Sequence, residues 1–99
     1  IWAARMPAAV PIYPRGHVQE AAGVDGPGCR LRVVHFLSPV PVGEIVDFYW
    51  ARGRAVGFAT GHRRAGADHV VRGQRGAAGY VAFVSERDGL SAVDLVTSD

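Results

Sequence analysis

The sequence predicts an α+β domain in which one helix packs on an antiparallel sheet of about four to five strands, in the order β-α-β-β-β-β. Residues 29–37 form a β-branched and aromatic run that ends at a proline, and residues 41–56 carry apolar side chains at helical spacing. Residues 58–96 contain short apolar runs separated by glycine-rich turns. Because short turns join antiparallel neighbours, these runs predict a sheet that the helix covers on one face.

Composition predicts one globular domain over residues 1–99. The chain is 48% hydrophobic and 20% charged, which is ordinary for a packed domain. Residues 1–28 read as an extended leader rich in proline and glycine, and residues 29–99 as the core. The net charge of +2 is too small to indicate nucleic-acid binding, and the single cysteine excludes an intrachain disulfide.

The helix has recognisable start and stop signals. Pro41 suits the first turn, and Glu44 lies near the positive end of the helix dipole. Gly57 supplies a residue that tolerates the left-handed conformation, and Phe58 then falls where a Schellman motif places its returning hydrophobic side chain. These signals predict a helix that ends at about residue 56.

Four further strands are expected after the helix. The first two are the weaker predictions, and the tight turn at Arg87-Asp88-Gly89 makes the last hairpin the strongest. The expected strands are 58–62, 68–72, 80–85 and 90–96, with turns at 63–67 and 73–79.

Both faces of the last two strands are expected to be partly apolar, so a second cover is needed besides the helix. The leader, a second copy of the chain or a partner protein would each serve, since soluble monomers rarely expose large apolar patches. The pattern therefore predicts docking or self-association through a sheet face or edge. We assign Val81, Phe83, Val93 and Leu95 to one face and Tyr80, Ala82, Val84, Leu90 and Val96 to the other.

Three segments together are similar to a pattern found in small bacterial envelope domains, often lipoproteins, of uncharacterised function. They are Val10-Pro11-Ile12-Tyr13-Pro14, the strand ending near Ser38, and Glu44 to Tyr49 followed by Gly57-Phe58. The pattern usually has tryptophan at Phe58 and a small residue at Arg15, and here it departs at both. The resemblance implies a periplasmic location, with any membrane anchor lying upstream.

No enzyme or cofactor is predicted. The serines lack a nucleophile-elbow context, no carboxylates pair for acid–base work, and the glycine-rich segment 23–28 precedes a strand instead of opening a helix. His62 and His69 can face each other across a hairpin, but two ligands fall short of a zinc site, so no metal is predicted and they remain weak candidates. His35 reads as an ordinary sheet residue.

The predicted function is therefore that of a non-enzymatic envelope domain acting through contacts with a protein partner or with itself. The alternative is a small-ligand or polyanion-binding module that uses an arginine-rich turn region, although solvated turns explain the arginines equally well. The candidate binding residues are Arg63, Arg64, Arg72, Arg75, Tyr80 and Phe83.

Overall fold

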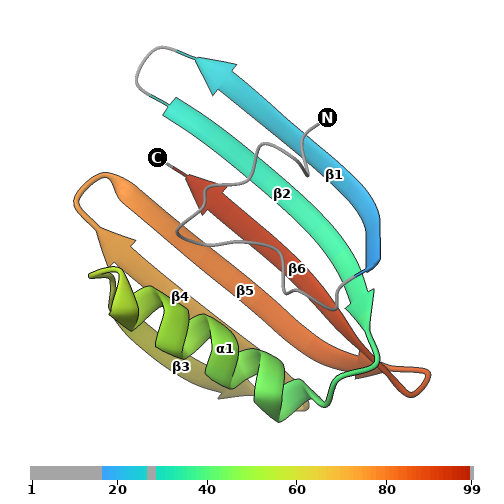
Figure 1. Cartoon of the computed structure of the whole chain (residues 1–99). Helices are drawn as coiled ribbons and strands as arrows, with labels where there is room; N and C mark the ends of the chain where they lie inside the picture. Colours follow the sequence, from blue (N-terminus) through green and yellow to red (C-terminus); the bar gives the residue numbers. More distant parts are fainter. Residues whose placement is uncertain (1–16, 27–28, 99) are drawn as a thin grey trace.

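The computed structural model describes residues 17–26 and 29–98 (Figure 1). The predicted α+β architecture is confirmed, with one helix packed on an antiparallel sheet. From residue 29 onward the element order is the predicted strand, helix and four strands. The elements are β1 (His17–Gly26), β2 (Cys29–Ser38), α1 (Val42–Ala55), β3 (Ala59–Ala65), β4 (Asp68–Arg75), β5 (Ala78–Arg87) and β6 (Leu90–Ser98).

The sheet has six strands in the order β1-β2-β6-β5-β4-β3, all antiparallel. β6 returns between β2 and β5, so the strand before the helix pairs with the last strand of the chain (Figure 1). The additional strand is β1, which lies in the segment expected to be leader. It pairs with β2, and a bulge between Val18 and Glu20 interrupts the pairing. The proline-rich part of the leader lies outside the described residues, as does the expected docking of its apolar side chains.

The helix ends as its sequence predicts. Gly57 takes a φ of +90°, its N–H donates to the Arg54 carbonyl at 3.2 Å, and the Phe58 N–H donates to the Gly53 carbonyl at 2.9 Å. These two bonds form a Schellman motif, which satisfies carbonyls that the helix end leaves free. Phe58 returns to the core and is buried.

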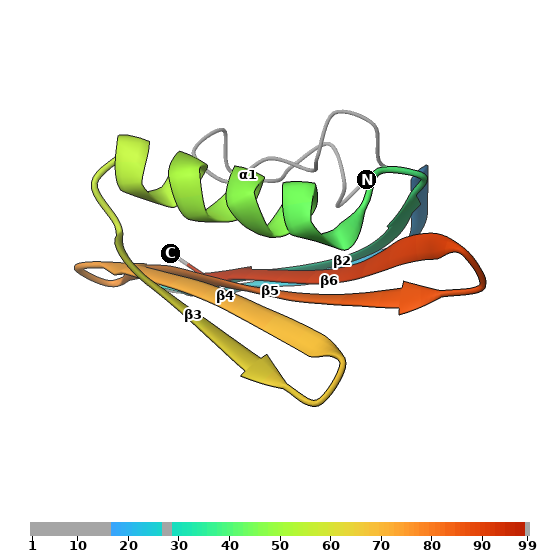
Figure 2. The same cartoon turned by 90° about the horizontal axis from the view of Figure 1, so that it is seen from below.

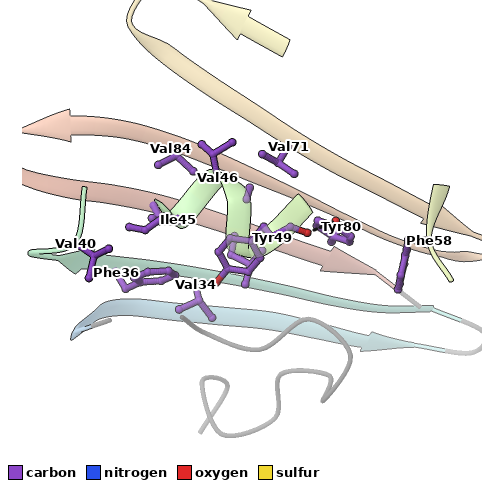
Figure 3. Packing of buried hydrophobic residues seen from close by; sticks show 13 residues of the cluster. Val34, Phe36, Val40, Ile45, Val46, Tyr49, Phe58, Val71, Tyr80 and Val84 are labelled. Carbon is purple, nitrogen blue, oxygen red and sulfur yellow. Dashed lines mark hydrogen bonds between the residues drawn. The ribbon is translucent and has the colours of Figure 1, made fainter. Parts of the chain in front are cut away.

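α1 lies across one face of the sheet and contacts β3, β4 and β5 (Figure 2). Every second residue of each strand points toward the helix, and the apolar side chains of the helix pack against these residues. Ile45 and Tyr49 belong to the same buried cluster as Phe36 and Val34 of β2 (Figure 3). The buried core comprises Val34, Phe36, Val40, Ile45, Val46, Tyr49, Phe58, Val71, Tyr80, Ala82, Val84, Val93 and Leu95.

Tyr80 fills the space between the helix and the sheet. Its ring packs edge-on against Phe58, with ring centroids 5.2 Å apart, and its hydroxyl donates to the Tyr49 carbonyl at 2.8 Å. A Cβ at Gly53 would lie 2.1 Å from the Tyr80 oxygen, and one at Gly73 would lie 2.3 Å from the ring. Burial raises the pKa of the Tyr80 phenol above its usual range. Two glycines on different elements therefore make room for one tyrosine.

Two paired serines hold the connection between β2 and α1, one by accepting a hydrogen bond from Val40 and the other by donating one to it. Ser38 and Ser91 are opposite each other on β2 and β6. The Val40 N–H donates to the Ser38 hydroxyl at 3.1 Å, and the Ser91 hydroxyl donates to the Val40 carbonyl at 2.6 Å. The segment before α1 is thereby fixed to the end of β2 and the start of β6.

The register of the last hairpin corrects the predicted division of its faces. Asp88 and Gly89 both have positive φ, and the two-residue turn pairs Arg87 with Leu90. Val84 is consequently opposite Val93, and Ala82 is opposite Leu95, so these residues share the helix side with Tyr80. The other side takes Val81, Phe83, Leu90 and Val96. Both faces are partly apolar, as expected, but Val93 and Leu95 lie on the face opposite to the one predicted for them.

The predicted turns were too long. The turn at 63–67 contracts to two residues, since β3 runs to Ala65 and β4 begins at Asp68. The turn at 73–79 likewise contracts to residues 76–77. Its glycines suggested a loop, whereas Gly73 lies within β4 because the Tyr80 ring occupies the position of its side chain.

The Gly53→Ala substitution is expected to lower the free energy of unfolding by about 1–3 kcal/mol, the usual cost of overpacking. Alanine is the better helix former, so helix propensity alone would predict stabilisation. The clash with Tyr80 and with Thr60 Cγ2, 2.9 Å from the added carbon, reverses that sign. Urea unfolding followed by circular dichroism measures the change.

Gly43→Ala is the matched control in the same helix. A Cβ at Gly43 meets nothing within 4 Å, so this variant should be unchanged or more stable by up to about 1 kcal/mol. Equal stability changes in the two variants would contradict the packing described for Tyr80.

Candidate functional site

The sheet face opposite α1, here called the open face, carries the large exposed apolar side chains of the part of the chain that the structure describes. Phe83 is 46% exposed, Leu31 is 37% exposed and Leu90 is 36% exposed. Figure 2 shows α1 on one side of the sheet and no described element on the other. Half-buried neighbours extend this surface across four strands. They are Val33 and Leu37 on β2, Val70 on β4, Val81 on β5 and Val96 on β6.

The centre of the open face contains a hydrogen-bonded polar pair. His35 and Asp94 are opposite each other on β2 and β6, and His35 Nδ1 lies 2.7 Å from Asp94 Oδ1. Phe83 is opposite Asp94 on the other side. The pair satisfies one polar atom of each side chain within the sheet, which makes an apolar surface around it easier to bury.

A hollow of about 480 Å³ lies at one end of the open face. It forms where Gly61 and Gly79 place no side chain on the sheet surface, between the side chains of Arg72 and Val81. The Arg72 side chain runs alongside Gly61, since a Cβ there would lie 3.0 Å from Arg72 Nε. The hollow combines an apolar floor with one guanidinium at its margin.

The four predicted binding arginines are divided between the two faces. Arg63 and Arg72 alternate onto the open face, whereas Arg64 and Arg75 alternate onto the helix side. Arg75 donates to the Val56 carbonyl and lies over the Phe58 ring, with Cζ 4.6 Å from its centroid. Arg75 therefore supports the end of the helix, and the four do not form a single basic edge.

Of the two predicted aromatic binding residues, only Phe83 is on the surface. Tyr80 is 2% exposed and belongs to the core, so it is not available as the surface binding residue that the sequence predicted. The physical reason is the pair of glycines that admit its ring beneath the helix. The alternation of the strand placed the two residues on opposite faces but did not show which face the helix covers.

The predicted pairing of His62 and His69 across the β3–β4 hairpin is present in a diagonal form. His62 is opposite Val71 and His69 is opposite Arg64, so the two rings meet across the strands, with His62 Nε2 2.9 Å from His69 Nδ1. Partial burial lowers the pKa of His69, and His62 and then Arg64 lower it further against the opposing charge of Asp68. Among the described residues, no three metal-ligating groups converge.

Comparison with models of known protein families and with curated proteins finds no match for this chain. The resemblance to envelope domains therefore stays a prediction. Within the described residues, α1 is the one helix, and it is too short to span a membrane.

Sequence reasoning missed part of the open face. Leu31 and the pair of His35 with Asp94 were not assigned to it, because the pairing of β2 with β6 brings together residues 59 positions apart. The alternation of Leu31, Val33, His35 and Leu37 in one strand was the available signal. This alternation indicates that the four residues share one face of the sheet, but it does not indicate which strand lies beside them.

The free energy of unfolding is expected to fall as pH drops below 6.5, the ordinary pKa of histidine. The folded pKa of His69 is lowered, so below that pH the unfolded chain binds a proton that the folded chain still excludes. The stability that neutral His69 contributes is present above the pKa of this residue in the unfolded chain. It is lost as pH falls through the lower pKa of His69 in the folded chain. Urea unfolding at a series of pH values from about 8 to about 5 measures it.

His69→Gln is the test variant, because it removes the titrating group while keeping a polar side chain. It should flatten the pH dependence in this range, and His62→Gln should flatten it partly by removing one cause of the lowered pKa. An unchanged pH dependence in His69→Gln would show that other groups produce it.

Proposed function

We propose that this chain is a non-enzymatic contact domain whose open face packs against the open face of a second copy. The observation that carries the proposal is the apolar surface around Phe83, which lies opposite the helix and is partly exposed in the single chain. Sheets that expose such a face are commonly covered by another sheet at a spacing of about 10 Å.

The area of the open face suits a stable dimer. Six strands spaced about 4.8 Å apart, each contributing about eight residues at about 3.3 Å per residue, give a face of roughly 800 Å². A standard protein–protein interface buries about 800 Å² on each partner. One open face is therefore large enough to bind a second copy without help from the loops.

The distribution of side chains on the open face also fits an interface. Val33, Val81 and Val96 lie in one row across β2, β6 and β5, and Phe83 projects beside them. Arg63 and Arg72 lie toward the β3 edge, where they would form a polar rim. Phe83 and the hollow at Gly79 share β5, so one copy offers both a projecting ring and a recess.

We place this contact function on the periplasmic side of a bacterial envelope. The support is the sequence pattern shared with small envelope domains, which comprises the proline-rich leader and the helix with its Phe48-Tyr49 pair. Immunoblotting of periplasmic and cytoplasmic fractions for the full-length native protein tests this location.

Phe83→Lys is expected to convert a dimer of the full chain into a monomer. The lysine places a charge in the middle of the proposed interface, but in the isolated chain it can pair with Asp94, its cross-strand neighbour. The monomer should therefore stay folded. Size-exclusion chromatography with light scattering across a concentration series measures the oligomeric state.

Ala51→Lys provides the matched control, because Ala51 is exposed on α1, on the opposite side of the sheet. It should dimerise as the unmodified chain does. A full chain that is monomeric at every concentration would refute self-association. The alternative of an anionic ligand at Arg72 in the hollow would then be the next hypothesis to examine.

A further inference from the structure

We propose that His62 and His69 form a two-ligand site for a late first-row divalent metal ion, with Cu²⁺ as the preferred occupant. The site lies on the helix side of β3 and β4, away from the open face, so it does not depend on the proposed contact function. It rests on the distance and placement of the two imidazoles.

The distance between the two nitrogens matches neighbouring positions in a square-planar coordination sphere. Metal–imidazole bonds of about 2.0–2.1 Å that meet at a right angle separate the two nitrogens by about 2.9 Å, whereas a tetrahedral angle separates them by about 3.4 Å. His62 Nε2 and His69 Nδ1 are 2.9 Å apart. Square-planar coordination by nitrogen is typical of Cu²⁺ and Ni²⁺, and Cu²⁺ binds such ligands more tightly.

Each nitrogen is able to present a lone pair. In the hydrogen bond between two neutral rings, one of these nitrogens carries the proton and the other accepts it. Metal binding requires the donor ring to move that proton to its second nitrogen through solvent. No net proton or electron is then gained or lost. In the hydrogen-bonded pair the two rings are nearly parallel, with centroids 5.2 Å apart, so the two nitrogens point at each other. Both rings must turn away from this hydrogen bond before their lone pairs meet at one metal ion, and His62 is exposed enough to permit it.

The surroundings balance the charge of a bound cation. Asp47 of α1 lines the same recess of about 210 Å³ as His62, together with Trp50, and Asp68 lies close enough to act on the charge of His69. Arg64 opposes a cation there, since it also lowers the pKa of His69. Because no third protein ligand converges within the described residues, water completes the coordination sphere.

The test is a titration of the full chain with Cu²⁺, read by electron paramagnetic resonance and by tryptophan fluorescence. A Trp2→Phe background leaves Trp50 as the one tryptophan. We expect one equivalent of Cu²⁺ to bind through two imidazole nitrogens and to quench Trp50, which shares the recess with His62. His62→Gln and His69→Gln should each lower the affinity by an order of magnitude or more.

His35→Gln and His17→Gln are the matched controls, since they remove the other two histidines of the chain. Both should bind Cu²⁺ as the unmodified chain does, and circular dichroism should show that all four variants are folded. Full-strength binding by His62→Gln or His69→Gln would overturn the proposal, as would a large loss of affinity in either control.

Discussion

The contact of Tyr80 with two glycines is the constraint on which the arrangement of helix and sheet depends. A side chain at Gly53 or at Gly73 would occupy the volume of the phenol ring, and the hydroxyl makes its hydrogen bond only when Tyr49 is directly above it. Close packing of this kind leaves little freedom in the position of α1. The helix is thereby held over β3, β4 and β5.

That position leaves the opposite face of the sheet without cover from any described element. A helix of 14 residues is about 21 Å long and about 10 Å wide, whereas six strands span nearly three times that width. One helix can therefore bury only part of one face. The residues around Phe83 alternate to the other face, which no described element covers.

The two proposed sites lie on opposite sides of the same sheet and are separable by mutation. Phe83 points from the open face, whereas His62 and His69 lie on the helix side at the β3–β4 hairpin. A residue two positions along a strand shares its face, and a residue one position along does not. Arg63, next to His62 in the chain, therefore belongs to the rim of the open face.

The sequence by itself determined the helix, its Schellman end at Gly57 and the β-branched strands, because these depend on residues close together in the chain. Only the tertiary structure decided what depends on strand register and on contacts between distant segments. Register assigned Val81 and Val93 to opposite faces, and two glycines 20 positions apart placed Tyr80 in the core. Pairing with β2 made a strand of residues 17–26, whose local sequence has few β-branched residues.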